Sequence, residues 1–309
     1  MIGHGIHAID TAFHRDHFDA AYLIVENGRA AFIDCGTNHS VPHLMAALAD
    51  VGLTAADVDW LLVTHVHLDH AGGAGALMAR LPNARLVVHP RGAPHMIDPF
   101  KLIAGATAVY GEAEMARSYG EIIGVPEARV VVAEDGHVVD FQGRPLLCID
   151  TPGHARHHFC VWDARSQGWF TGDTFGLSYR ELDSSNGPFV LPTTSPVQFE
   201  PEALKASITR LLSYRPQSMY LTHYGRVGDV ERLGRDLHEQ IDAMVVIGKA
   251  CDGQPDRHER MRDALTGLYL ERAHAHGCPF DDAGILQILG VDIELNAQGM
   301  ASWLDRDKR

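Results

Sequence analysis

The stretch THVHLDH at residues 64–70 is the most informative part of this chain. It follows directly on residues 60–63, a short apolar run typical of a buried strand, so we expect its side chains at the end of that strand. Imidazole and carboxylate are ligands that zinc, iron and manganese accept in proteins. The stretch therefore predicts a metal site, with four candidate ligands in six residues: His65, His67, Asp69 and His70.

Three further polar motifs follow at greater distances along the chain. They are TPGH at 151–154, FTGD at 170–173 and LTHYG at 221–225, and each comes directly after a strand-like run. Because strand ends can gather at one edge of a sheet, residues distant in sequence can assemble a single site there. The four motifs together predict one metal centre built from separate strands.

The remaining pattern is rich in strands. Two apolar runs at 20–26 and 29–34 flank Asn27-Gly28, which is a strong signal for a β-hairpin. Further strands are expected near residues 60–63, 85–89, 129–133, 146–149, 158–162, 168–171 and 218–222, with helical segments between some of them. This order favours sheets covered by helices over a simple parallel α/β repeat.

In this order, the four motifs resemble those of the metallo-β-lactamase superfamily of metallohydrolases, over about residues 10 to 225. The resemblance implies an α/β (α+β) fold, an αββα sandwich with a two-metal site at one edge of its two sheets. It also implies seven metal ligands, all present here: His65, His67 and His154 for the first ion, Asp69, His70 and His223 for the second, and Asp173 as the bridge.

Within the superfamily, the run FTGDTFG at 170–176 and the helical tail look most similar to the glyoxalase II/lactonase-like branch. Two divalent ions about 3.5–4 Å apart lower the pKa of a shared water and polarise a carbonyl group. The expected reaction is attack by a metal-bound hydroxide on an acyl carbonyl, with Asp69 orienting the hydroxide and no covalent intermediate. The imidazole-rich ligand set favours two zinc ions, with iron or manganese as alternatives.

The charge, the apolar runs and the cysteines of the chain indicate which partners and which cellular compartment to expect. The chain has 26 Lys and Arg against 40 Asp and Glu, a formal net charge of -14, which disfavours nucleic acid as a partner. It has no run of about 18 apolar residues and no basic, apolar leader, so we expect no membrane contact and a cytoplasmic location. The five cysteines are scattered without CxxC spacing, which fits a reducing compartment.

We expect two parts, a metallo-β-lactamase-like catalytic domain over residues 1–225 and a C-terminal helical extension over 226–309 packed on it. In the extension, apolar residues recur at helical spacing from Val230 to Val245 and again from Met261 to Leu268. Packing against the body of the protein explains these stripes, and a homodimer interface is the alternative that stays open.

Residues 174–199 contain several Pro-based breakers and form a long segment without a clear element, and such loops are commonly functional. We expect this segment, with the helical stretch 99–123, to cover a small apolar or neutral lactone, thioester or ester. Lactonases of the superfamily often carry a Tyr three residues after the bridging Asp, where this chain has Gly176, and Tyr179 could replace it. The candidate substrate contacts are Phe175, Tyr179, Phe189 and Tyr224, and the alternative for the loop is that its apolar residues fold back onto the core.

Two other functions remain open on the same residues. One is a mononuclear non-haem iron oxidoreductase, similar to the persulfide dioxygenases. The other is a weakly active ligand-binding or signalling protein that keeps the ligands. The sequence favours the hydrolase, because seven filled ligand positions provide for two ions.

Overall fold

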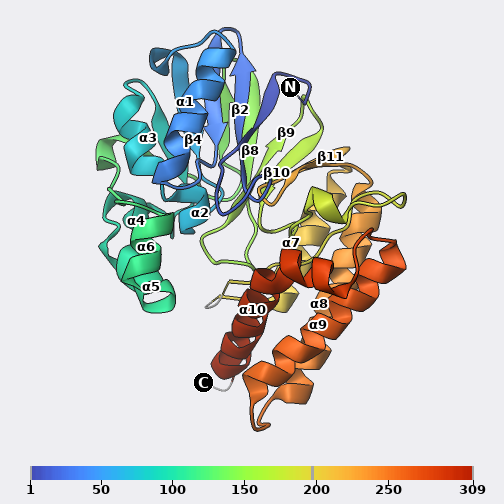
Figure 1. The fold of residues 1–309 in the computed structure, drawn as a ribbon. Helices are drawn as coiled ribbons and strands as arrows, with labels where there is room; N and C mark the ends of the chain where they lie inside the picture. Colours follow the sequence, from blue (N-terminus) through green and yellow to red (C-terminus); the bar gives the residue numbers. More distant parts are fainter. Residues whose placement is uncertain (1, 196–197, 308–309) are drawn as a thin grey trace. The chain divides into compact units, whose positions relative to one another are not determined.

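The computed structural model describes residues 2–195 and 198–307. The chain divides into two compact units (Figure 1). The first contains residues 1–150, 157–172 and 218–226, and the second contains residues 151–156, 173–217 and 227–309. The second unit therefore joins the C-terminal helices to residues 151–156 and 173–217, and it does not coincide with the expected extension 226–309. The packing of that extension on the catalytic domain stays a prediction.

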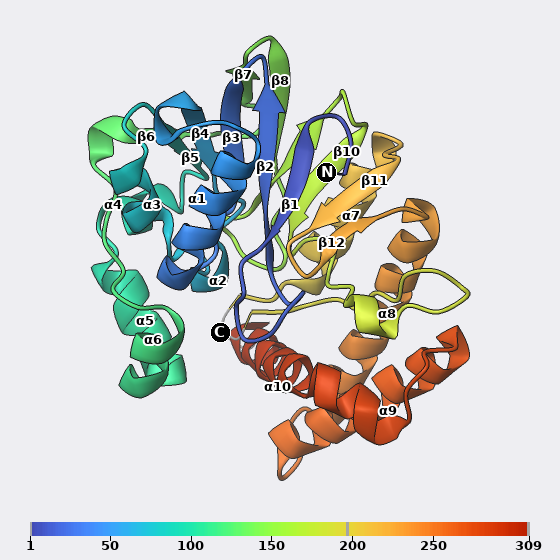
Figure 2. The same cartoon turned by 45° about the horizontal axis from the view of Figure 1, so that its top comes forward.

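The first sheet of the first unit is mixed and has six strands, which Figure 2 shows in their spatial order from β1 to β6. The first three strands pair antiparallel, and β3 to β6 pair in parallel. At the β2–β3 turn, Asn27 and Gly28 both have positive φ, 48° and 74°, as a tight hairpin turn requires. The strands are β1 (Ile6–Asp10), β2 (Ala20–Glu26), β3 (Arg29–Ile33), β4 (Val58–Leu62), β5 (Arg85–Val88) and β6 (Val130–Val132).

The second sheet also has six strands, in the order β12-β11-β10-β9-β8-β7. Strands β7 to β10 pair antiparallel, whereas β10 and β11 are parallel. Its strands are β7 (Val138–Phe141), β8 (Arg144–Asp150), β9 (Phe159–Asp163), β10 (Gly168–Gly172), β11 (Ser218–Leu221) and β12 (Gly225–Val227).

Two apolar cores hold the layers of the first unit together. One lies between the two sheets and includes Tyr22 and Ile33 from the first sheet and Phe159 and Phe170 from the second. The other lies on the opposite face of the first sheet, which α1 and α3 cover (Figure 1). The helices of this unit are α1 (Val41–Asp50), α2 (Leu68–Ala71), α3 (Ala74–Arg80), α4 (Ala93–Ile97), α5 (Phe100–Tyr110) and α6 (Glu112–Ser118), with short 3-10 turns at Asn38–Ser40, Ala55–Asp57 and Glu127–Arg129.

The second unit is mainly helical. Helix α7 packs on α8, and α8, α9 and α10 pack on one another. The helices are α7 (Pro201–Ser213), α8 (Val230–Cys251), α9 (Arg257–His276) and α10 (Asp282–Asp307). The segment 174–199 runs without a long element, as expected, and holds only a 3-10 turn at Arg180–Leu182 and isolated bridges in its described part. None of the described helices is long and apolar enough to cross a bilayer.

A buried ion pair fixes one end of the second sheet. Arg144 at the start of β8 donates to both carboxylate oxygens of Asp163 at the end of β9, at 3.0 and 2.6 Å. The side chains are 1% and 0% exposed, and the guanidinium also donates to the His4 carbonyl at 2.7 Å. Two buried charges are tolerated because each satisfies the other's hydrogen-bonding groups.

Replacing Asp163 by Asn should therefore lower the free energy of unfolding by about 3 kcal/mol, because the buried Arg144 charge then keeps only the more distant carboxylate of Glu26, 3.6 Å from its Nη1. Urea denaturation of the purified protein measures this value. The matched control is Asp59→Asn, which breaks a half-exposed pair with Arg29 and should cost about 1 kcal/mol or less. Equal losses in the two variants would contradict the assignment of Arg144–Asp163 as a structural pair.

Candidate metal centre

The end of β4 presents the HxHxDH motif, as the sequence predicts. Strand β4 ends at Leu62, and a short connection leads into α2, which begins at Leu68. His67 directly precedes α2, and the single turn of α2 contains Asp69 and His70. The rings of His65 and His70 are buried, with centroids 4.0 Å apart. The motif therefore places several ligand side chains around one point of the first unit.

The rings of His65 and His67 face each other through nitrogen atoms. Nε2 of His65 lies 2.8 Å from Nδ1 of His67. On the other side of the His65 ring, Nδ1 lies 3.2 Å from the Thr64 hydroxyl, and this hydroxyl lies 2.9 Å from a carboxylate oxygen of Asp34. The hydroxyl has one proton, which it donates to the carboxylate, so it accepts from the His65 Nδ1–H.

With its proton on Nδ1, the His65 ring has a lone pair on Nε2, and this lone pair is directed at His67. At a separation of 2.8 Å, the two nitrogen atoms need either a hydrogen on Nδ1 of His67 or a cation between them. The distance and the lone pair on His65 therefore fit the binding of a metal ion by this pair. Imidazole nitrogen suits zinc, iron and manganese alike.

Asp69, His70 and His223 form a second cluster in the same unit. One carboxylate oxygen of Asp69 lies 3.5 Å from Nε2 of His70 and 3.5 Å from Nε2 of His223. The three candidate ligand atoms all lie within 4.8 Å of one another. His223 follows β11 and reaches the cluster from the second sheet, so the two sheets of this unit meet at the cluster.

Both histidines of this cluster are oriented through their Nδ1 atoms. Nδ1 of His70 lies 3.0 Å from a carboxylate oxygen of Asp34, and Nδ1 of His223 lies 3.0 Å from the Phe18 carbonyl oxygen. Each acceptor holds the proton on Nδ1 and leaves the Nε2 lone pair on the side of Asp69. Partners of this kind set the tautomer and the ring orientation of metal-binding histidines.

Asp34 links the two clusters. Its side chain is 2% exposed, and it accepts hydrogen bonds from the Thr64 backbone N–H at 2.7 Å, from the Thr222 hydroxyl at 3.2 Å and from His70. The residue directly follows β3 and has φ of 55°, an uncommon backbone conformation for a residue with a side chain. One carboxylate therefore orients groups from the ends of β4, β11 and α2.

In the second unit, His154 and Asp173 form a pair. Nε2 of His154 lies 3.2 Å from a carboxylate oxygen of Asp173, and both side chains are at most 5% exposed. Nδ1 of His154 lies 3.2 Å from the Thr193 carbonyl oxygen, so this ring also has its Nε2 lone pair directed at a carboxylate. The Gly153 backbone has φ of +132°, and a Cβ there would lie 2.3 Å from the Leu204 Cα. The close approach of α7 therefore requires glycine before His154.

His158 packs against the candidate metal ligand His65. Its ring is buried and stacks on His65 with centroids 4.7 Å apart. A Cβ on Gly172 would lie 2.6 Å from Nε2 of His158 and 2.6 Å from the Thr64 hydroxyl oxygen, and the Gly172 φ is +46°. The end of β10 can approach the ligand pair this closely only because residue 172 is glycine.

A buried acid beside the clusters is not signalled by any sequence motif. Asp19 precedes β2, is fully buried, and accepts a hydrogen bond from the Thr11 hydroxyl at 3.1 Å. Burial raises the pKa of Asp19 to about 7, against the opposing effect of the nearby His223 and His70. At neutral pH this carboxyl group therefore titrates near the second cluster.

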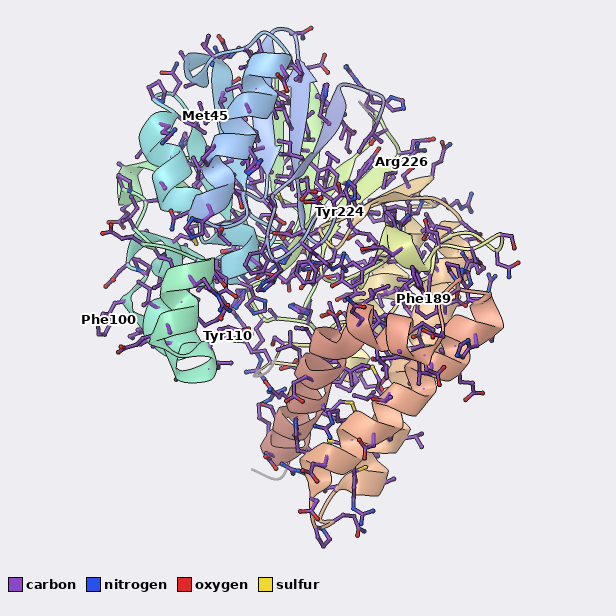
Figure 3. The ribbon with its side chains drawn as sticks, in the orientation of Figure 1. Met45, Phe100, Tyr110, Phe189, Tyr224 and Arg226 are labelled. Carbon is purple, nitrogen blue, oxygen red and sulfur yellow. The ribbon has the colours of Figure 1, made fainter. Side chains whose placement is uncertain are left out.

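An aromatic wall extends from the second cluster within the first unit. The Phe18 ring lies 5.3 Å from the His223 ring, and the Phe13 ring lies 5.9 Å from Phe18 and 5.6 Å from Tyr119. Burial and then the charge of Asp69 raise the pKa of Tyr110, labelled in Figure 3 at the end of α5, to about 12. The helical stretch near 99–123 thus flanks the metal centre, as part of the expected cover would.

The candidate substrate residues fall in different places. Tyr224 is in the first unit, where its ring lies 4.9 Å from His17. The other three belong to the second unit and are buried, and the Tyr179 hydroxyl donates to Asp292 of α10 at 3.2 Å. Phe189 packs beside His276 with ring centroids 5.5 Å apart. Substrate contact by Phe175, Tyr179, Phe189 and Tyr224 stays a prediction.

Changing Asp34 to Asn tests its role as the link between the clusters. The amide would place N–H groups where the carboxylate now accepts from His70 and Thr222, so the His70 ring should lose its orientation. We expect metal affinity about 10–100-fold weaker, measured by chelator competition, with an unchanged circular dichroism spectrum. The control Asp57→Asn changes a half-exposed carboxylate outside both clusters and should bind metal as the wild type does. Unchanged affinity in Asp34→Asn would refute the assignment.

The raised pKa of Asp19 predicts a pH effect on the stability of the metal-free protein. Because the native pKa is above that of the unfolded chain, the stabilising effect of the bound proton is complete below the unfolded pKa and is lost as pH rises to about 7. As the pH rises from about 5 to about 8, the contribution of Asp19 should lower the free energy of unfolding by about 2–3 kcal/mol. Asp19→Asn should remove that part of the slope, and an identical slope in both proteins would contradict the shift.

Comparison with known proteins agrees with this geometry. A family model of the metallo-beta-lactamase superfamily matches residues 15–223. A metallo-beta-lactamase fold-containing protein of Sulfurisphaera tokodaii is 27% identical over 235 residues, which are 74% of this chain and 82% of that protein. A hydroxyacylglutathione hydrolase of Acidiphilium cryptum is 25% identical over 263 residues, 82% of this chain and 85% of the relative.

The fold is also found among solved structures. The metallo-beta-lactamase family protein of Thermus thermophilus has a TM-score of 0.68 and 19% identity over 98% of this chain and 94% of its own. The expected fold class, two mixed sheets with helices and C-terminal helices, is confirmed. Because the family model covers more than half of the sequence, this chain belongs to the metallo-beta-lactamase superfamily.

Proposed function

We propose that this protein is a binuclear metal-dependent hydrolase that cleaves an acyl bond in a small molecule, with a lactone, thioester or ester as the substrate class. The observation that carries the proposal is the cluster of Asp69, His70 and His223, whose ligand atoms lie within 4.8 Å of one another. Both of its rings are held through Nδ1 with Nε2 on the side of the carboxylate. This second cluster, beside the His65–His67 pair, supports two ions over one.

The proposed ligand sets follow the superfamily resemblance. His65, His67 and His154 would hold the first ion, Asp69, His70 and His223 the second, and Asp173 both. The imidazole-rich sets favour zinc, and iron and manganese suit the same donors. Divalent ions held in this way lower the pKa of a water and polarise a carbonyl group.

The residues of the chain have defined tasks in this reaction. Asp69 and Asp173 offset part of the positive charge, and Asp69, whose side chain is 24% exposed, can accept a proton or orient a water. Asp34 keeps the protons of His70 and, through Thr64, of His65 on the side away from the ions. A side-chain nucleophile is not required, so we expect no acyl-enzyme.

Two observations support the acyl bond. The Acidiphilium relative is a hydroxyacylglutathione hydrolase, and this name gives an acylated compound as the substrate of that protein. The wall of Phe13, Phe18 and Tyr119 beside His223 offers apolar surface to an acyl group. The formal net charge of -14 disfavours long-range attraction of polyanionic substrates.

The experiment combines metal analysis with a substrate panel of a lactone, a thioester, a β-lactam and a phosphodiester. We expect about two metals per chain, loss of both in Asp173→Ala, loss mainly of one in His223→Ala, and fastest turnover of the lactone or thioester. Mass spectrometry during turnover should find no acylated protein.

One tightly bound iron with oxygen consumption would instead establish the mononuclear iron oxidoreductase. Two bound metals without turnover of any panel member would favour the ligand-binding protein. Preference for the phosphodiester would refute the proposed substrate class while leaving the metal centre intact.

A further inference from the structure

Helix α10 holds the loop segment 192–195 through the side chain of Asn296. Oδ1 of Asn296 accepts a hydrogen bond from the Thr194 backbone N–H at 2.8 Å, and its Nδ2 donates to the Pro192 carbonyl oxygen at 3.0 Å. These partners fix the orientation of the amide, because a backbone N–H can only donate and a carbonyl oxygen can only accept. Asn296 is 0% exposed, so both bonds are made in a site closed to solvent. The side chain therefore binds the residues on both sides of Thr193.

The residue between these two attachments orients the candidate metal ligand His154. The Thr193 carbonyl oxygen lies 3.2 Å from Nδ1 of His154, and a carbonyl oxygen can only accept, so Nδ1 carries the proton and donates it. The Ser195 hydroxyl, two residues further along, donates to the His154 backbone carbonyl at 3.2 Å. The segment 192–195 is therefore hydrogen-bonded to α10 and to His154.

Helix α10 also approaches this segment at Gly299, one turn after Asn296. A Cβ on Gly299 would lie 2.1 Å from the Thr194 hydroxyl oxygen and 2.7 Å from the Ser195 carbonyl oxygen. Both distances are far below van der Waals contact, so any side chain at this position would displace the segment. The Thr194 hydroxyl also donates to the Leu295 carbonyl at 3.2 Å. An amide side chain and a glycine of α10 thus define the position of one short segment.

We propose that Asn296 and Gly299 are positioning residues of the candidate metal centre. They fix the Thr193 carbonyl, which holds the proton of His154 on Nδ1 and keeps its Nε2 on the side of Asp173, 3.2 Å away. Acceptors of this kind set the tautomer and the ring orientation of metal-binding histidines. The inference rests on the proposed function in taking His154 as a metal ligand, whereas the hydrogen bonds that carry it lie within the second unit.

A further bond of Asn296 provides a matched control. Its Nδ2 also donates to the Tyr269 hydroxyl of α9 at 2.9 Å, and this hydroxyl donates to the Met244 sulfur at 3.6 Å. Tyr269→Phe removes these two bonds and leaves both bonds of Asn296 to the loop in place. The variant therefore disturbs the same buried network without changing a contact of the segment 192–195.

The first measurement follows the Nδ1–H proton of His154 by nitrogen–proton NMR of the full-length, metal-free protein, with His154→Gln to identify the signal. Asn296→Ala and Gly299→Ala should make this proton exchange with water at least about tenfold faster, because its carbonyl acceptor is displaced. Tyr269→Phe and Gly290→Ala should keep the wild-type rate. Gly290 also belongs to α10, but a Cβ there meets nothing within 4 Å.

The second measurement is Zn²⁺ binding by chelator competition. Asn296→Ala and Gly299→Ala should bind one zinc ion about tenfold more weakly and the other as the wild type does, because His154 is assigned to one ion. The two controls should bind both ions as the wild type does. Gly299→Ala keeps every hydrogen-bonding group, and alanine is the better helix former, so weaker binding in this variant reports the displaced segment. It also tests the proposal where Asn296→Ala does not fold.

Wild-type exchange of the His154 proton in both α10 variants would overturn the proposal, and so would wild-type zinc affinity in both. Equal losses in Tyr269→Phe and Asn296→Ala would also overturn it, because they would show a general effect of the buried network. A wild-type protein that binds zinc without hydrolysing any member of the substrate panel would refute the proposed function alone. The exchange measurement is made without metal, so the two proposals can fail independently.

Discussion

The buried carboxylate of Asp34 is the constraint on which the metal centre of the first unit depends. It accepts from the backbone N–H and the hydroxyl of Thr64, from the His70 imidazole and from the Thr222 hydroxyl, which is much further along the chain. A charged acceptor in a site closed to water is favourable only while these donors stay in place. The same bonds that stabilise the buried charge therefore fix the tautomers of His70 and, through Thr64, of His65.

The topology explains why these groups meet. Strands β3 and β4 are parallel neighbours, so Asp34 and the HxHxDH motif leave the sheet at the same edge. In the second sheet, β11 ends directly before Thr222 and His223. The Ala20 N–H donates to the Thr222 carbonyl at 2.8 Å, which ties that end to the start of β2 in the first sheet. The polar residues that follow β3, β4 and β11 therefore lie close together at one edge of the two sheets.

The sequence was sufficient for the elements that carry strong local signals. The hairpin at Asn27-Gly28, the strand before His65 and the ligand motifs were predicted because turn chemistry and apolar runs are local properties. Strands β1 and β7 were not predicted, since short edge strands give weak patterns. Helix α10 lies in the predicted helical extension 226–309, although no apolar stripe marked its position. Asp34 and Asp19 were missed for another reason. Each is a single acid beside a strand, and only pairing between strands reveals what it contacts.

In the second unit, the long segment 174–199 is anchored to the C-terminal helices. Tyr179 bonds Asp292 of α10, and Phe189 lies against His276 of α9, while a role of this segment as a cover over substrate stays a prediction. The segment begins directly after Asp173, which pairs with His154. Further along, the carbonyls of residues 187, 188 and 190 accept hydrogen bonds from side chains of α8 and α9. The candidate metal pair His154–Asp173 and the C-terminal helices therefore belong to one compact unit, because the backbone that carries Asp173 continues into a loop that these helices hold.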